Sequence, residues 1–95
     1  MRNYELVMII SPSVAEENVP ATIDKTSHFI TERGGSVIET NQWGRKKLSY
    51  PIKNFMEGNY VLTKLSMGPK LAAELEASLG ISEDILRHLL VRLDD

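Results

Sequence analysis

The chain has 95 residues, of which 42% are hydrophobic and 25% are charged, and it contains no cysteine. This is the composition of one small globular domain, so we expect residues 1–95 to fold as a single domain. The lack of cysteine excludes a disulfide framework, a thiol nucleophile and a thiolate metal site, and a reducing compartment such as the cytoplasm fits best. No run approaches the roughly 20 apolar residues of a membrane span, so no membrane partner is expected.

The charge is distributed unevenly along the chain. A net charge of −2 on its own argues against a nucleic-acid partner, because phosphate contacts need a basic surface. Residues 42–54, however, contain no acid and carry a local charge of +4, from Arg45, Lys46, Lys47 and Lys53. Since the total is −2, the rest of the chain carries −6. The sequence therefore predicts one basic element on an acidic body.

The first element is a strand over residues 3–10, which are apolar in both alternating sets. Such a pattern is typical of a central strand that is covered on both faces. Ser13, followed by Glu16 three residues later, has the pattern of a capping box that begins a helix.

A helix is expected over about residues 14–33. Pro20 lacks an N–H group, so either a short irregular turn precedes the main helix or the helix bends there. The helix should end at Gly34-Gly35, where a residue free to adopt positive φ is needed.

A long hairpin follows. Residues 36–53 are expected to be extended, with a bulge or bend near Gly44, where the apolar alternation is interrupted. Residues 54–58 supply turn residues, and residues 60–67 form the antiparallel return strand. Pro51 is poorly suited to a central strand, so this hairpin should have an edge there.

The last third predicts a second helix and a final strand. After Gly68-Pro69, Leu71, Leu75 and Leu79 recur every four residues, and Gly80 is expected to end the helix. Residues 85–93 alternate as a strand.

The order strand, helix, strand, strand, helix, strand predicts an α+β fold of the ferredoxin-like, split β-α-β kind. This is a four-stranded antiparallel sheet with two helices on one face. The side chains expected to face the helices are Leu6, Met8, Val61 and Leu65. The apolar residues expected on the open face, where they indicate a partner surface, are Val7, Ile9, Leu62, Leu89 and Val91.

The sequence gives little support for a catalytic or metal-binding site. His28 and Glu32 lie one helical turn apart, but a third metal ligand is missing, so a solvated helix pair is the better interpretation. His88 is interpreted as a partly buried strand residue. There is no nucleophile elbow, P-loop or dinucleotide fingerprint. We therefore expect no enzyme, no metal, no cofactor and no small-molecule substrate.

The basic stretch from Trp43 to Asn54 remains. Its consecutive cations alternate between the two faces of an extended strand, as on a ribbon that straddles a phosphate backbone. Lysines also protect edge strands from aggregation, and composition alone leaves both interpretations open.

The chain resembles, from end to end, the bacterial small-subunit ribosomal protein S-six (S6) family. The resemblance is carried by Met1-Arg2-Asn3-Tyr4-Glu5, Gly34-Gly35, Tyr60-Val61-Leu62 and Arg87, and most specifically by Trp43-Gly44-Arg45-Lys46-Lys47-Leu48-Ser49-Tyr50-Pro51-Ile52-Lys53. It implies a structural component of the small ribosomal subunit in the cytoplasm. Its partners would be small-subunit ribosomal RNA and the small-subunit ribosomal protein S-eighteen (S18).

The resemblance also suggests site residues by position. The basic positions that match, and are expected to contact ribosomal RNA, are Arg2, Arg45, Lys46, Lys47, Lys53 and Arg87. The positions expected to shape the hairpin or contact the protein partner are Trp43, Tyr50 and Pro51. Lysine at 46 and 47, where relatives often have arginine, keeps the charge but not the forked guanidinium geometry.

Two other functions use the same topology. A binder of single-stranded RNA needs aromatic residues on the open face of the central strands, and on the first and last strands only Tyr4 is aromatic, with the helices as its expected neighbours. A small-ligand regulatory domain or hydrolase would need a cluster of functional groups that the sequence does not show.

Overall fold

The computed structural model describes residues 1–93; Asp94 and Asp95, which the predicted domain includes, lie outside the described residues. The elements follow the predicted order, with a short 3-10 turn, η1, before the first helix. They are β1 (Arg2–Ile10), η1 (Glu16–Asn18), α1 (Val19–Glu32), β2 (Ser36–Ile52), β3 (Phe55–Met67), α2 (Pro69–Ile81) and β4 (Ile85–Arg92). No helix in this part of the chain is long and apolar enough to span a membrane.

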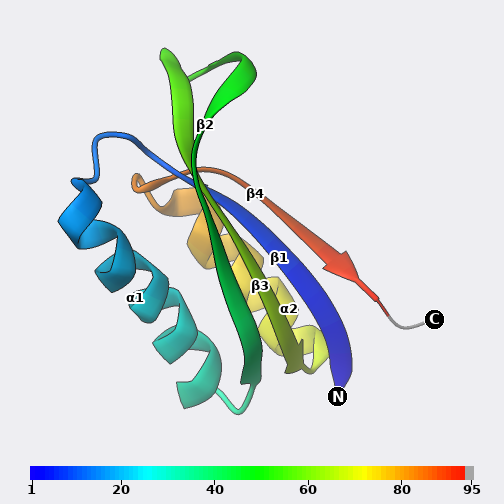
Figure 1. Ribbon diagram of the computed structural model, residues 1–95. Helices are drawn as coiled ribbons and strands as arrows, with labels where there is room; N and C mark the ends of the chain where they lie inside the picture. Colours follow the sequence, from blue (N-terminus) through cyan, green and yellow to red (C-terminus); the bar gives the residue numbers. More distant parts are fainter. Residues whose placement is uncertain (94–95) are drawn as a thin grey trace.

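The four strands form one antiparallel sheet in the order β2-β3-β1-β4, and α1 and α2 cover the same face of it (Figure 1). This arrangement confirms the ferredoxin-like prediction. β1 is central, pairing with β3 on one side and β4 on the other. β2 is an edge strand, as the presence of Pro51 predicts, because an edge position leaves one side of the backbone without a ladder partner.

The main core lies between the sheet and the two helices. The four side chains predicted to face the helices are all at most 1% exposed, and Tyr4 is buried beside them, as expected. From the helices this core receives Val19, Ile23, Ile30, Leu71, Ala72, Leu75 and Leu79. Period-two burial along β1 and β3 is what a sheet covered by helices on one face requires.

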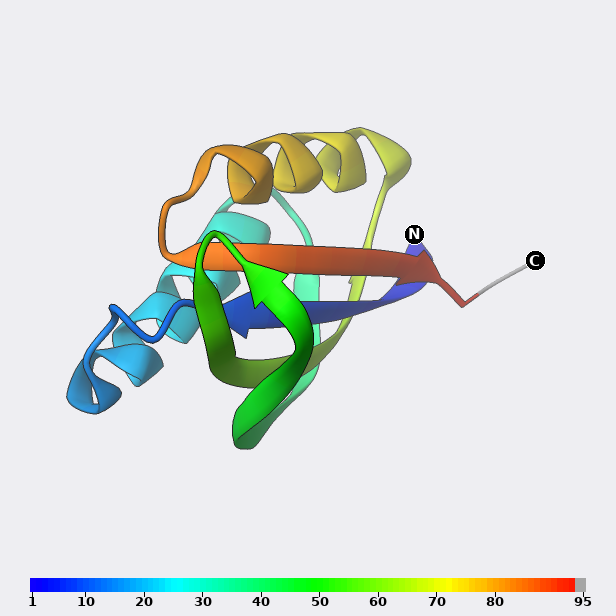
Figure 2. The same ribbon diagram turned by 90° about the horizontal axis from the view of Figure 1, so that it is seen from above.

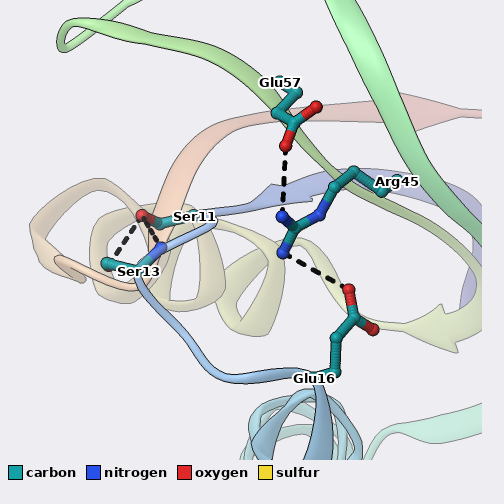
Figure 3. Close-up of polar contacts among 5 residues, drawn as sticks. All are labelled: Ser11, Ser13, Glu16, Arg45 and Glu57. Carbon is teal, nitrogen blue, oxygen red and sulfur yellow. Dashed lines mark hydrogen bonds and ion pairs between the residues drawn. The ribbon is translucent and has the colours of Figure 1, made fainter.

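The connection from β1 to α1 differs from the prediction. Ser13 lies before η1, five residues before Asn18, the residue that precedes α1, and no side chain caps either helical segment. The Ser13 N–H donates to Oγ of Ser11 at 3.1 Å, and the carboxylate of Glu16 points toward Arg45 (Figure 3). The predicted capping box is therefore wrong. The short turn before the main helix is confirmed, and it puts Pro20 in the first turn of α1, where its missing N–H has no intrahelical partner.

The ends of the two helices agree with the prediction in one case and differ slightly in the other. α1 ends before Gly34, which has a φ of +91°, and the Gly35 N–H donates to the Ile30 carbonyl at 2.9 Å, as expected of a glycine helix stop. Gly80, by contrast, lies within α2, which continues to Ile81. Its backbone is not left-handed, so it does not end the helix as predicted.

The β2–β3 hairpin has a tighter turn than predicted. Its two central residues, Lys53 and Asn54, have φ values of 51° and 70°, the signature of a type I′ turn, and Ile52 already pairs with Phe55. The prediction of a turn over residues 54–58 is therefore wrong, since these residues belong mostly to β3. The predicted bulge is confirmed by the register shift between Gln42 and Gly44 and by the φ of +83° at Gly44.

Residues 44–58, called the basic hairpin below, extend past the ends of the other strands and curl over them (Figures 1 and 2). This explains a second difference from the prediction. Ile9 points away from the helices as expected, but it is only 8% exposed because Leu48 of the basic hairpin packs on it. The open face is therefore covered at this end of the sheet and exposed at the other.

Gly58 allows the close approach between the basic hairpin and β1. A Cβ atom there would lie 2.5 Å from Cγ2 of Ile9 and 3.1 Å from the Ile10 carbonyl oxygen. We predict that Gly58→Ala lowers the free energy of unfolding by about 1–3 kcal/mol through overpacking. Gly80→Ala, where the added methyl meets nothing within 4 Å, should instead raise it by up to about 1 kcal/mol. Urea denaturation of both variants checks this, and equal midpoints would contradict it.

Candidate nucleic-acid interface

The basic hairpin is fixed to the end of the sheet by a small apolar cluster of its own. Ile9 of β1, Leu48 of β2 and Leu86 of β4 are buried together, and Ile52, Phe55 and Tyr60 pack against them. Because this cluster joins three strands on the face opposite the helices, the hairpin has a defined position although its tip projects beyond the sheet (Figure 1).

Arg45 lies between two carboxylates. Its Nη1 donates to Oε1 of Glu57 at 3.1 Å, and its Nη2 lies 3.3 Å from Oε1 of Glu16 (Figure 3). Glu57 belongs to the returning strand of the same hairpin, whereas Glu16 belongs to η1 in the body of the protein. The guanidinium thus spans two parts of the chain that are far apart in sequence, and two negative charges surround its one positive charge.

Arg87 also contacts the basic hairpin. It lies on β4, and its Nη1 donates a hydrogen bond to the hydroxyl of Tyr50 on β2. The sequence assigned Tyr50 to hairpin geometry and Arg87 to RNA contact, and the structure brings the two together. Both arginines near the hairpin therefore have protein partners.

Lys46, Lys47 and Lys53 are exposed and have no carboxylate within ion-pair distance in the described part of the chain. Across the hairpin, Lys46 is opposite Gly58 and Lys47 is opposite Glu57. Successive residues of a strand point to opposite faces, so Lys46 points away from the face that carries Arg45 and Lys47. Lys53 occupies the turn itself. The three lysines thus offer positive charge on both faces and at the tip.

Arg2 is remote from these residues. It pairs with Met67, while the other end of β1, at Ile10, pairs with Asn59 beside the basic hairpin. The length of β1 separates the two sites by roughly 25 Å. The structure brings five of the six predicted basic residues to one end of the sheet and leaves Arg2 at the other.

The two carboxylates around Arg45 were missed by sequence reasoning. With regular pairing, the turn at Lys53-Asn54 would place Glu57 opposite Tyr50. The register shift between Lys47 and Ile52 places it opposite Lys47 instead, on the same face as Arg45, and no local pattern reports that shift. Glu16 carried no local signal either. Its proximity to Arg45 depends on how the β1–α1 connection lies against the sheet, which no local pattern reports.

Beyond the basic hairpin, the open face carries a row of apolar side chains, followed by the charged pair of Glu5 and Lys64. Val7 of β1 pairs with Leu62 of β3 on one side and with Leu89 of β4 on the other, so these three side chains form a row across the sheet. Leu89 is 59% exposed and Val91 is 42% exposed. A row of this kind on one side of the basic hairpin is suited to a protein partner rather than to water.

The histidines form only surface pairs. Nδ1 of His28 lies 3.7 Å from Glu32 on α1, and both side chains are largely exposed. Nε2 of the partly buried His88 lies 3.8 Å from Glu76 on α2, in keeping with its interpretation as a strand residue with a polar partner. Within residues 1–93, no group of three or more His, Cys, Asp or Glu side chains is placed to hold a metal ion.

Comparisons with known proteins point in one direction. A family model described as Ribosomal protein S6 matches residues 3–92. The chain is 41% identical over 95 residues to small ribosomal subunit protein bS6 of Moorella thermoacetica, covering 100% of this chain and 97% of that protein. It is 43% identical over 94 residues to the protein of the same name from Beutenbergia cavernae, covering 99% and 98%. The crystal structure of 30S ribosomal protein S6 from Thermotoga maritima matches with a TM-score of 0.90 at 30% identity, over 96% of this chain and 86% of that one.

Leu48 should be the main apolar anchor of the basic hairpin. We predict that Leu48→Ala lowers the free energy of unfolding by about 2–3 kcal/mol, because it opens a cavity between Ile9 and Leu86. Lys46→Ala, two residues away and exposed, should change it by less than about 0.5 kcal/mol. Urea denaturation measures both, and hydrogen exchange of the hairpin amides should rise only in the leucine variant. Equal exchange in the two variants would contradict the anchoring role.

Proposed function

This chain belongs to the ribosomal protein S6 family and is a structural protein of the small ribosomal subunit rather than an enzyme; from that premise, we propose that it binds small-subunit ribosomal RNA jointly with the small-subunit protein S18. Small-subunit membership makes the cytoplasmic ribosome its location. We further propose that residues 1–95 act as one domain. The observation that carries the RNA-binding proposal is a projecting hairpin with three exposed lysines, which have no ion-pair partner among residues 1–93, on an otherwise acidic protein.

The proposed RNA contacts fall into three groups. Lys46, Lys47 and Lys53 provide charge on both faces and at the tip of the hairpin, which suits phosphates on either side of it. Arg45 and Arg87 retain N–H donors beyond those facing their protein partners, and they add contacts at the base of the hairpin. Arg2 provides a separate contact at the far end of the sheet. Trp43, Tyr50 and Pro51 shape the hairpin or meet the protein partner.

The proposed S18 surface is the exposed half of the open sheet face. Its row of Val7, Leu62 and Leu89 adjoins the basic hairpin, so a partner bound there would lie beside the RNA. The acidic charge of the body would favour a basic partner. The protein partner and the RNA would then use adjacent surfaces of the chain.

Joint binding follows from the size of the basic surface. About four to six phosphate contacts give a strong salt dependence but a weak affinity by themselves. A protein partner adds its own RNA contacts. If the two proteins form their joint surface before the RNA binds, less conformational entropy is lost on binding. Recognition by hairpin charges would depend on the shape of a folded RNA rather than on base edges.

The alternative of single-stranded RNA stacked on the sheet is disfavoured. Tyr4 is buried in the main core, and Tyr60 of β3 is half-buried against the second cluster. The other open-face positions on the central strands include the partly exposed Val7 and Leu62 and the charged pair of Glu5 and Lys64, none of which offers a ring for a base to stack on.

Reversing the charge of the hairpin tests the RNA contacts. We predict that Lys46→Glu with Lys47→Glu weakens binding of the S18 complex to small-subunit ribosomal RNA by about tenfold or more near 0.15 M salt, and flattens the salt dependence. The matched control is Lys25→Glu with Lys70→Glu, which makes the same charge change on the helices. Filter binding over a salt series measures both. Equal losses in the two double variants would show that the hairpin has no special role.

A polar substitution on the open face tests the partner surface. We predict that Leu89→Asp weakens binding of purified S18 by about tenfold or more, because a charge replaces an apolar contact at the most exposed position of the row. Ile81→Asp, at an even more exposed position at the end of α2, is the control and should leave binding unchanged. Isothermal titration calorimetry measures both. An unaffected Leu89 variant would place S18 elsewhere on the protein.

A further inference from the structure

Glu16 lies outside the basic hairpin but holds one of its residues. Among the ion pairs of residues 1–93, the pair of Glu16 with Arg45 is the one that joins the basic hairpin to the rest of the protein. Glu57 holds the same guanidinium from within the hairpin. Arg45 therefore has one partner that moves with the hairpin and one that does not.

The segment that carries Glu16 is held in place by backbone hydrogen bonds. Ser11 is 1% exposed, and its N–H donates to the Asp84 carbonyl at 2.8 Å, which ties the segment to the start of β4. The Val14 N–H donates to the Ser11 carbonyl at 3.0 Å, and the Asn18 N–H donates to the Ala15 carbonyl at 2.8 Å. These bonds fix the backbone on both sides of Glu16, so its carboxylate is presented from a defined place.

Arg45 lies at the base of the basic hairpin, at the point that sets the direction of the hairpin relative to the sheet. It follows the bulge at Gly44, after which β2 leaves the plane of the sheet, and a bulge bends its strand. Arg45 pairs with Asn59, and from there the returning strand is only five residues from the turn residue Asn54, a distance of roughly 16 Å. A change of about 10° at Arg45 would therefore move the tip by roughly 3 Å, about the length of a hydrogen bond, so a small loss of restraint would misplace the tip lysine.

From this geometry we infer that Glu16 is a positioning residue for RNA recognition: through Arg45 it sets the direction in which the basic hairpin presents Lys46, Lys47 and Lys53. The inference rests on the proposed RNA-binding function. By positioning the hairpin, Glu16 would strengthen RNA binding. By charge alone it would weaken RNA binding, because a carboxylate repels phosphates. The two effects have opposite signs, so a measurement can separate them.

Glu17 provides a matched control. It is the next residue in η1, carries the same charge and has no ion pair within residues 1–93. Glu16→Gln and Glu17→Gln therefore remove one negative charge at nearly the same distance from the RNA, but only the first releases Arg45. Both side chains are exposed, so both variants should keep the thermal stability of the parent to within a few degrees.

The test measures the affinity of each variant, in complex with S18, for small-subunit ribosomal RNA and for polyuridylate. Glu16→Gln should bind the folded RNA about fivefold more weakly than Glu17→Gln, because a less restrained hairpin no longer matches a fixed surface. The two variants should bind polyuridylate equally, because a flexible strand adapts to either hairpin. A general loss of stability would not separate the two RNAs in this way.

A double-variant cycle then tests the route through Arg45. In an Arg45→Gln background, Glu16→Gln should have no further effect on the affinity for the folded RNA. Equal affinities of the Glu16 and Glu17 variants for the folded RNA would overturn the positioning role, as would tighter binding of both RNAs by Glu16→Gln alone. If the parent complex itself does not bind small-subunit ribosomal RNA, the proposed function fails as well, so the two failures are distinguishable.

Discussion

The end of β1 is the point on which the rest of the structure depends. Ile10 is fully buried among the residues that the helices cover, while its neighbour Ile9 is buried on the opposite face beneath the basic hairpin. Two adjacent residues of one strand thus belong to two separate cores, as the alternation of a strand permits. Because β1 is paired on both sides, its position is fixed, and the basic hairpin takes its position from it. The projecting site is an extension of the core rather than a loop attached to it.

Much of the fold could be predicted because it depends on local pattern. The double alternation of residues 3–10, the glycine stop after α1 and the interrupted period at Gly44 each reflect backbone or burial requirements that act within a few residues. The predictions failed where contacts with segments distant in the sequence determine the local structure. Ser13 and Glu16 have the spacing of a capping box, but a 3-10 turn intervenes and Arg45 takes the carboxylate. The left-handed turn at Lys53-Asn54 was missed because lysine rarely adopts positive φ.

The candidate site was predicted as a set of cations, and the structure divides that set by residue type. Arg45 and Arg87 each make directional contacts to other side chains, with two carboxylates and a tyrosine hydroxyl respectively. The lysines of the hairpin make none among the described residues. This division follows the chemistry of the two side chains, since a guanidinium offers several donors in a fixed plane whereas an ammonium is a mobile point charge. The sequence could not reveal it, because both side chains contribute the same charge to a composition.

The strand order has a consequence for biosynthesis. The central strand is the first to be made, but its partners come late, because Ile10 pairs with Asn59 and Tyr4 pairs with Arg92. During synthesis β1 must therefore wait for residues 59–67 on one side and for β4 on the other, while the outer part of the β2–β3 hairpin contains its own pairing and can close as soon as residue 59 has emerged. The segment with the most exposed positive charge is thus able to form before the sheet that will orient it, and the last eight residues of structure, β4, complete the surface on which it comes to rest.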